Sequence, residues 1–400
     1  MGQASNAKQE RLPELDGLRA LAIITVLLHH ALSAFPASTV RRLAGFGWTG
    51  VDLFFVISGF FLGGILIDQR AADNYYRIFY LRRFLRIVPL YVLVITPALL
   101  ITVLGLQSWF KGHSLGGKSS PIIWLYPFFL QNFGNAFMLS SPKYLGPSWS
   151  LAVEEQFYLL LAPLVRVFDP RRLPCLIIPV ILAAPVLRGL LVLLLQADAK
   201  TACYQLLPCR WDALFLGVLA AYAVRNPSWR EWQVRRLGFL RVLWLILAAG
   251  MLLLAISGWS QYDPKIAVPG YTWIAAFFTC SLLLAHLNPA GSLRHWLSRP
   301  VLRPVALVSY GLYLLQGPTV AVIESFFHPP SESPIGWKFM GVNCLALLLD
   351  ITFATLSWRF FESRLIRLGH QHRFRGGRSE VYTPNAVITR SVTGLEKGAD

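Results

Sequence analysis

Long apolar stretches constrain this chain more than any other feature of its sequence. A helix needs about 20 apolar residues to cross about 30 Å of hydrocarbon, and ten stretches approach that length. They lie near residues 16–35, 48–67, 88–108, 148–168, 174–195, 208–224, 239–257, 270–288, 304–326 and 338–360. Of the 400 residues, 55% are hydrophobic and 14% are charged, unlike the composition of a soluble domain. We therefore expect an all-α integral membrane protein with about ten transmembrane helices.

Basic residues between the apolar stretches predict the orientation of the chain. Arginines cluster after the second, fourth, sixth and eighth stretches, and the positive-inside rule assigns such loops to the cytoplasm. Both termini are then expected to be cytoplasmic. Because the arginines lie in short loops, the formal charge of +17 points to membrane lipids or phosphate-bearing ligands and not to nucleic acid.

The apolar stretches form one transmembrane unit between two polar ends. We expect a cytoplasmic N-terminal segment over residues 1–12, without a convincing cleavage site for a signal peptide. The transmembrane domain is expected over residues 13–367. Residues 368–400 are polar and basic, with nothing apolar enough to build a core. We expect this tail to be disordered and cytoplasmic.

The first stretch carries two polar residues on one helical face. Arg19 and His30 are eleven residues apart, which is about three turns and about 16 Å of rise. Charge is costly inside lipid, so a functional role is favoured. The alternative is that Arg19 extends to the headgroups and His30 to water at the far end. A histidine at this depth is suited to take a proton from a hydroxyl group near neutral pH.

Two carboxylates are expected at the same depth as His30. Asp52 opens the second stretch, and Glu154 lies in the first third of the fourth. A carboxylate beside His30 would orient the imidazole and stabilise its charged form. Other interpretations remain open, since Asp52 can cap its helix and Glu154 or Glu155 can lie at the positive end of a helix dipole.

The five cysteines are spread too widely for a metal site, and we expect no metal. Cys203 and Cys209 fall in a loop that the predicted topology places outside, where a disulfide can form. The sequence leaves that bridge open.

Motifs in a consistent order carry a family resemblance. In the first stretch, ten residues separate an arginine, Arg19, from a histidine, His30. The other motifs are GWTGVDLFFVISGF (residues 47–60), RRFLRIVPLY (82–91), SWSLAVEEQFYL (148–159), RWDALFLGVLAA (210–221), SYGLYLLQGP (309–318) and SWRFFESRL (357–365). Together they resemble the membrane-bound acyltransferase-3 family of acyl-CoA-dependent O-acyltransferases. The resemblance covers roughly residues 12–367.

The resemblance implies an enzyme of the bacterial cytoplasmic (inner) membrane. Such an enzyme moves an acyl group, most often acetyl, from cytoplasmic acyl-CoA to a hydroxyl group of a carbohydrate, glycolipid or other envelope molecule. It selects His30 over His29 and Glu154 over Glu155 as catalytic candidates, and Asp52 remains a third. His30 is expected to act as general base or to carry the acyl group briefly.

The resemblance also implies a site for coenzyme A. Arg83 and Arg86 form the family's two-arginine element, expected in the loop before the third stretch, and arginine pairs clamp phosphates by bidentate hydrogen bonds. Arg19 is the third candidate, facing the pantetheine or a phosphate. Topological charge is the alternative for the pair. Conceivable donors to the oxyanion are Arg210, Tyr310 and Ser150.

Two other functions remain to be weighed. A transporter or flippase for a lipid-linked sugar would also show about ten spans and buried charge. Gln316 stands where the family commonly has a histidine, which puts a titratable role there in doubt and suggests, as a third possibility, a member retained for binding or sensing. Transfer across the membrane to an outer acceptor is our hypothesis for the enzyme.

Overall fold

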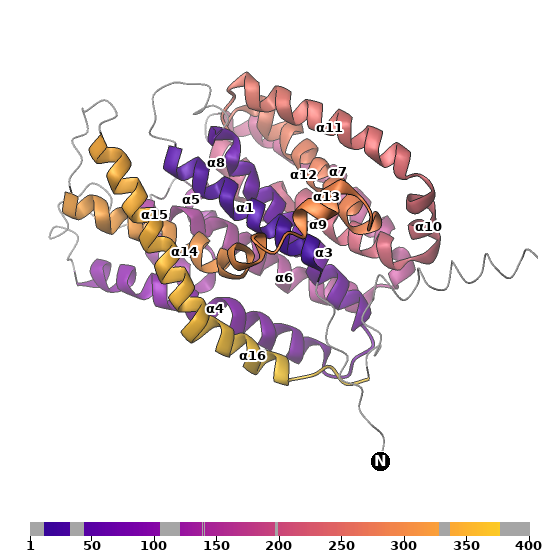
Figure 1. Ribbon diagram of the computed structural model, residues 1–400, viewed down its shortest axis with the longest axis horizontal. Coiled ribbons are helices and arrows are strands. Elements are labelled where there is room, and N and C mark those ends of the chain that lie inside the picture. Colours follow the sequence, from indigo (N-terminus) through magenta and orange to yellow (C-terminus); the bar gives the residue numbers. More distant parts are fainter. Residues whose placement is uncertain are drawn as a thin grey trace, which may run out of the picture.

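The computed structural model describes residues 12–32, 44–104, 121–137, 139, 141–196, 199–327 and 337–376. Within these ranges the regular structure is helical and no strand occurs (Figure 1). Nine helical segments of the described chain are long and apolar enough to cross a membrane. These findings confirm the all-α membrane fold.

The expected stretches correspond to ten long helices within the described residues. These are α1 (Pro13–Leu32), α3 (Gly50–Asp68), α4 (Tyr75–Val103), α6 (Trp149–Val167), α7 (Leu173–Leu195), α9 (Leu207–Arg225), α11 (Leu237–Ser257), α12 (Tyr271–Leu287), α14 (Leu302–Phe327) and α15 (Trp337–Ser357). Of these ten helices, α6 is not among the nine candidate spans; it carries the charged residues Glu154, Glu155 and Arg166.

Short α-helices and short 3₁₀- or π-helical segments connect the long ones. The short α-helices are α5 (Gln131–Ala136), α8 (Ala199–Gln205), α10 (Pro227–Arg235), α13 (Ser292–Leu297) and α16 (Ser363–Gln371). The 3₁₀-helical segments are η1 (Phe46–Thr49), η3 (Pro121–Phe128), η4 (Lys143–Ser148) and η5 (Pro170–Arg172), and the π-helical segments are η7 (Ile266–Gly270) and η8 (Trp358–Glu362).

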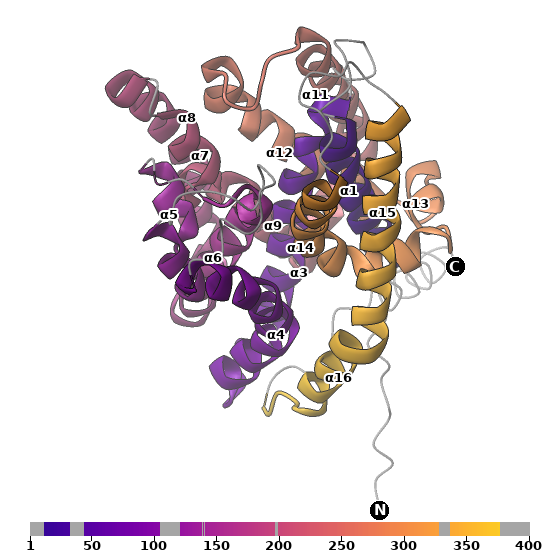
Figure 2. The same ribbon diagram turned by 90° about the vertical axis from the view of Figure 1, so that its left-hand side faces the viewer.

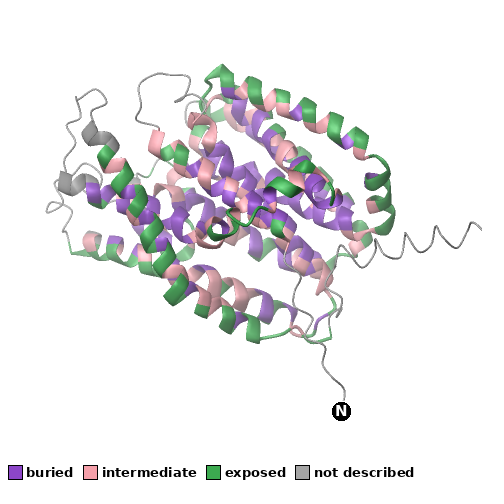
Figure 3. Ribbon diagram, viewed as in Figure 1, coloured by how far each residue is buried: buried purple, intermediate pink, exposed green. Residues whose placement is uncertain are grey.

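The centre of the bundle is the pair α3 and α9, the most buried of the nine segments (Figure 3). Glycines allow their backbones to touch. A Cβ on Gly59 would collide with the backbone of Leu214, and one on Gly217 would collide with the backbone of Val56. Small residues at a helix crossing give close van der Waals packing, which drives helix association in lipid. Around this pair, α4, α11 and α15 expose apolar side chains such as Leu93, Leu253 and Leu348.

The third expected span begins earlier than predicted. We expected its start near residue 88, with Arg83 and Arg86 in the preceding loop. The structure corrects this, because α4 already begins at Tyr75 and both arginines lie inside it. Arginine has good helix propensity, so the motif extends the helix beyond its apolar part.

The last helix extends past residue 367, where we expected the transmembrane domain to end. α16 continues to Gln371 and packs along α4 (Figures 1 and 2). Residues 372–376, here called the strap, bond to the turn before α4. The boundary placed at residue 367 therefore falls inside a helix, and the part of the expected disordered tail up to residue 376 is held in place. The rest of that tail, and residues 1–11 of the N-terminal segment, lie outside the described residues.

Candidate active site

Two adjoining cavities open between α1, α3, α4, α6 and α14. The smaller, of about 90 Å³, is here called the glutamate cavity because Glu154 lines it. The larger, of about 390 Å³, is called the arginine cavity because six arginines line it. The two share five lining residues: Arg19, Phe61, Leu62, Arg83 and Arg86. Three of the predicted site residues therefore lie at the boundary between two adjoining spaces.

The arginines reach this boundary from two helices. Arg83 and Arg86 are three residues apart in α4, so they lie on one face of the helix. Arg19 comes from α1, and its guanidinium lies 5.3 Å from the ring centroid of Phe61. Tyr310 of α14 donates a 2.7 Å hydrogen bond to the carbonyl oxygen of Ile87. This bond fixes α14 against α4 beside the arginine pair.

Glu154 faces the glutamate cavity from α6. Its carboxylate accepts a 2.9 Å hydrogen bond from Ser58 and a 2.7 Å hydrogen bond from Tyr158. Glu155 lines neither of these cavities. The preference for Glu154 over Glu155 therefore agrees with the direction in which the two side chains point.

Ser58 and Tyr158 are residues that the sequence prediction missed. Tyr158 follows Glu154 by four positions, which places the two side chains on one helical face, and that spacing was available as a signal. Ser58 is a hydroxyl-bearing residue in a helix whose other polar side chains are Asp52 and Asp68. The pairing of Ser58 with Glu154 depends on how α3 packs against α6, which no local pattern reveals.

A second hydroxyl pair lies in the glutamate cavity. The hydroxyl groups of Ser150 and Tyr313 are 2.6 Å apart, and Tyr313 donates a 2.7 Å hydrogen bond to the carbonyl oxygen of Pro147. Of the conceivable oxyanion donors, Ser150 and Tyr310 line this cavity, whereas Arg210 lines neither cavity.

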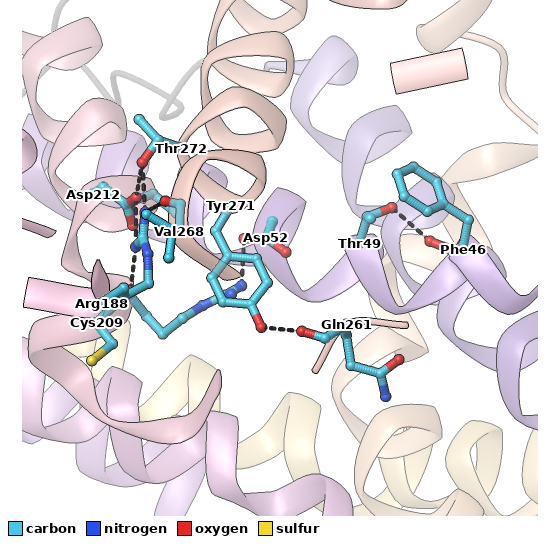
Figure 4. A network of polar contacts seen from close by, with 12 residues as sticks. Phe46, Thr49, Asp52, Arg188, Cys209, Asp212, Gln261, Val268, Tyr271 and Thr272 are labelled. Carbon is cyan, nitrogen blue, oxygen red and sulfur yellow. Dashed lines mark hydrogen bonds and ion pairs between the residues drawn. The ribbon is translucent and has the colours of Figure 1, made fainter. Parts of the chain in front are cut away.

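Asp52 lies away from His30. It is two residues past Gly50, which contacts Thr25 of α1, and two residues rotate a helix by about 200°. Asp52 therefore points from α3 to α9, where it is fully buried and forms an ion pair with Arg210 (Figure 4). The structure thus pairs this carboxylate with a guanidinium and not with the imidazole that we expected it to orient.

The Asp52 pair belongs to a buried polar network. Arg188 contacts Asp212 at 2.9 Å and donates a 2.7 Å hydrogen bond to Thr272 (Figure 4). The guanidinium of Arg210 lies 4.0 Å from the ring centroid of Tyr271. Buried charge is tolerated where it is paired and hydrogen-bonded, so this network joins α3, α7, α9 and α12.

His30 lies near the last turn of α1, far from Glu154. α1 and α3 run antiparallel, with Gly50 against Thr25. Ser58, which binds Glu154, is eight residues beyond Gly50, about 12 Å along the axis. His30 is five residues beyond Thr25, about 7.5 Å in the opposite direction. The two candidates are therefore separated by about 20 Å, and the shared depth that we expected is corrected.

The starting depth of α6 explains this separation. We expected the second and fourth spans to begin level with each other. Instead Trp149, the first residue of α6, packs against Phe55 of α3 with ring centroids 6.1 Å apart. Phe55 is five residues into α3, so α6 begins about 7.5 Å deeper.

His30 nevertheless lies on the same stripe of α1 as Arg19. Val26 contacts Gly50, and His30 follows Val26 by one turn. Val51, next to Gly50, lines the far end of the glutamate cavity. The exposed imidazole of His30 is therefore about one turn, roughly 6 Å of rise, beyond that end.

The remaining predicted residues are placed as follows. Gln316 is buried in α14 and donates a 3.1 Å hydrogen bond to the carbonyl oxygen of Tyr313. Cys203 and Cys209 are both buried and unbridged, so the disulfide left open by the sequence is not formed. Within the described residues, no group of three histidine, cysteine, aspartate or glutamate side chains is arranged to hold a metal.

Comparison with known proteins identifies the family. A family model described as an acyltransferase domain, acyltransferase 3, matches residues 12–359. The chain belongs to the acyltransferase-3 family. The match includes all six predicted site residues and ends before α16.

Proteins similar to the chain include several named O-acetyltransferases. The chain is 25% identical to the peptidoglycan O-acetyltransferase OatA of Listeria monocytogenes, over 96% of this chain and 60% of that protein. It is 27% identical to O-acetyltransferase OatA of Staphylococcus aureus, over 90% of this chain and 58% of that protein. It is also 27% identical to the putative peptidoglycan O-acetyltransferase YrhL of Bacillus subtilis, over 88% and 54%. The chain thus spans a little over half of the length of these relatives. No solved structure is significantly similar to it.

Proposed function

We propose that this chain is a membrane O-acyltransferase that moves an acetyl group from acetyl-CoA, bound on the cytoplasmic side, to a hydroxyl group of an envelope glycan. Peptidoglycan is the first acceptor to test, because relatives of the chain carry it in their names. Localisation in the bacterial inner membrane agrees with the apolar helices and with these relatives.

The observation that carries the proposal is the shared wall of the two cavities. Arg19, Arg83 and Arg86 line both the wide arginine cavity and the narrow glutamate cavity. A donor with phosphates at one end and a slender thioester arm at the other matches this arrangement. Guanidinium groups bind phosphates bidentately, and the arm would extend past them into the narrow cavity.

The glutamate cavity would hold the pantetheine arm. The amide N–H groups of that arm need acceptors once they leave water. Glu154 offers carboxylate oxygens there, and Ser58 and Tyr158 orient it. The hydroxyl groups of Ser150 and Tyr313 are available near the thioester end. In this proposal Glu154 contacts the donor and does not orient His30.

His30 would act at the acceptor end. It lies about one turn beyond the far end of the glutamate cavity, so a thioester leaving that end would approach the imidazole. As a general base, His30 takes the proton of the acceptor hydroxyl while the hydroxyl oxygen attacks the thioester carbonyl. The thiolate of coenzyme A then leaves toward the arginines. Asp52 is a positioning residue that joins α3 to α9 in this scheme.

Purified protein in sealed vesicles tests the proposal. With radiolabelled acetyl-CoA supplied on the arginine-rich side and a soluble peptidoglycan fragment on both sides, we expect labelled acetyl ester on the fragment of the opposite side and free coenzyme A on the donor side. A flippase would move substrate without consuming thioester. Acetylation found only on the donor side would overturn the proposal that transfer crosses the membrane. If no thioester were consumed, the proposal that the chain is an acyltransferase would be overturned.

A further inference from the structure

The strap forms part of the wall of the arginine cavity. Phe374 in the strap and His370 at the end of α16 both line this cavity. Phe374 is half-buried and packs against the apolar core. The family match ends at residue 359, so neither residue belongs to a motif that identifies the family.

Specific hydrogen bonds hold the strap against the turn that precedes α4. The backbone N–H of Asp73 donates to the carbonyl oxygen of Arg375 at 2.9 Å. Asn74 donates through its side chain to the carbonyl oxygen of Arg373 at 3.0 Å and accepts from the N–H of Arg375 at 2.9 Å. These bonds use the strap's backbone, which leaves the ring of Phe374 available to the cavity.

Arg82 connects the strap to the arginines of α4. It donates a 2.6 Å hydrogen bond to the carbonyl oxygen of His372. Its guanidinium lies 5.1 Å from the ring centroid of Phe374, and Arg82 also lines the cavity. The planar cation lies over the aromatic ring, so the two groups form one stacked pair in the wall of the cavity. Purine bases stack on such surfaces because every base has a π face.

The charge of the cavity indicates an anionic ligand. Among the described residues that line it, two aspartates face six arginines. Asp68 is occupied by Arg225 through two 2.9 Å hydrogen bonds, which leaves Asp16 among five further arginines. The ligand should therefore carry several negative charges. Four phenylalanines line the cavity, Phe60, Phe61, Phe79 and Phe374, and of these Phe374 is the one on the strap, stacked with Arg82.

We propose that the strap forms the nucleotide subsite for the donor, with the purine base stacking on the open face of the Phe374–Arg82 pair and His370 facing the donor's phosphates. This inference rests on the proposed function, since it concerns the same donor. It predicts that the strap distinguishes a donor with a nucleotide from one that ends at the pantetheine phosphate.

The test compares two donors on one variant. Acetyl-CoA and acetyl-4′-phosphopantetheine share the thioester arm, and only the first carries the adenosine portion. We expect Phe374→Ala to raise the KM for acetyl-CoA about 10-fold, within the range of base stacking, and to leave the KM for acetyl-4′-phosphopantetheine unchanged. The inhibition constant of adenosine 3′,5′-bisphosphate should rise by a similar factor in this variant.

Two further variants separate recognition from stability. Phe374→Tyr should keep the KM of the unsubstituted protein, because it keeps the aromatic ring, whereas Phe374→Leu keeps apolar bulk and should behave like Phe374→Ala. Phe360→Ala, an exposed aromatic on η8, is the matched control and should change neither KM. Equal increases in KM for both donors, or no increase for either, would overturn the subsite. Absence of turnover with both donors in the unsubstituted protein would instead overturn the proposed function.

Discussion

Ser58 on α3 donates a 2.9 Å hydrogen bond to Glu154 on α6, across 96 positions of sequence. The bond orients the carboxylate in the cavity where we place the thioester arm. Glu154→Gln keeps the shape of the side chain and removes its charge. We expect a KM for acetyl-CoA raised by about 10-fold or more, since hydrogen bonds to a charged group contribute about 1.5–3 kcal/mol. Steady-state kinetics would measure this. Ser58→Ala should show a smaller increase, and an unchanged KM in both variants would contradict a role for Glu154 in donor binding.

His30→Ala tests the acceptor end. A general base contributes about 10²–10⁴-fold to rate, so we expect kcat to fall by at least about 100-fold. Binding of acetyl-CoA should persist, because the arginine and glutamate cavities remain intact. Isothermal titration with coenzyme A would measure that binding. His29→Ala is the matched control, and equal losses of kcat in the two variants would show that proton transfer is not specific to His30.

The arginine pair of α4 should control donor affinity. Arg83→Ala and Arg86→Ala each remove a charged donor from the wall between the cavities. We expect the KM for acetyl-CoA to rise about 10- to 100-fold in each, and less so at high salt because phosphate contacts are screened. Arg235, exposed on α10 and paired with Glu231, provides the control. If Arg235→Ala raises KM equally, general surface charge and not the cavity attracts the donor.

The Asp52–Arg210 pair should act on stability. Asp52→Asn leaves the buried guanidinium of Arg210 without its counterion, and breaking such a pair costs about 3–5 kcal/mol. We expect a clearly lower midpoint of thermal unfolding in detergent. The double variant Asp52→Leu with Arg210→Met removes both charges and should recover much of the loss. A normal midpoint with lost activity in Asp52→Asn would show instead that Asp52 takes part in chemistry.

The sequence predicted the membrane helices because lipid imposes a minimum length of apolar residues. Polar helical extensions were harder to predict. Arg83 and Arg86 lie inside α4, although hydropathy alone favours a loop there. Similarly, α16 is an amphipathic helix beyond the last apolar stretch, and its contact with α4 stabilises a segment that composition assigned to the tail.

The candidate site was predicted residue by residue but not as one assembly. Topology gives the side of the membrane, and Arg19, Arg83 and Arg86 do meet at one boundary. Topology does not predict how deep in the membrane each of these residues lies. Glu154 and His30 are separated because α6 begins beside Phe55, and Asp52 turns away because of its angular position on α3. Such offsets arise from packing between distant segments.

The contact between α3 and α9 also limits how the enzyme can move. The two backbones touch at Gly59 and Gly217, so no side chain lies between them there. The Asp52–Arg210 ion pair also joins these two helices. We expect α3 and α9 to move together as one rigid unit. We therefore expect any widening of the passage for a bulky cofactor to involve α4 and α14, which line both cavities and pack less extensively against α3 and α9.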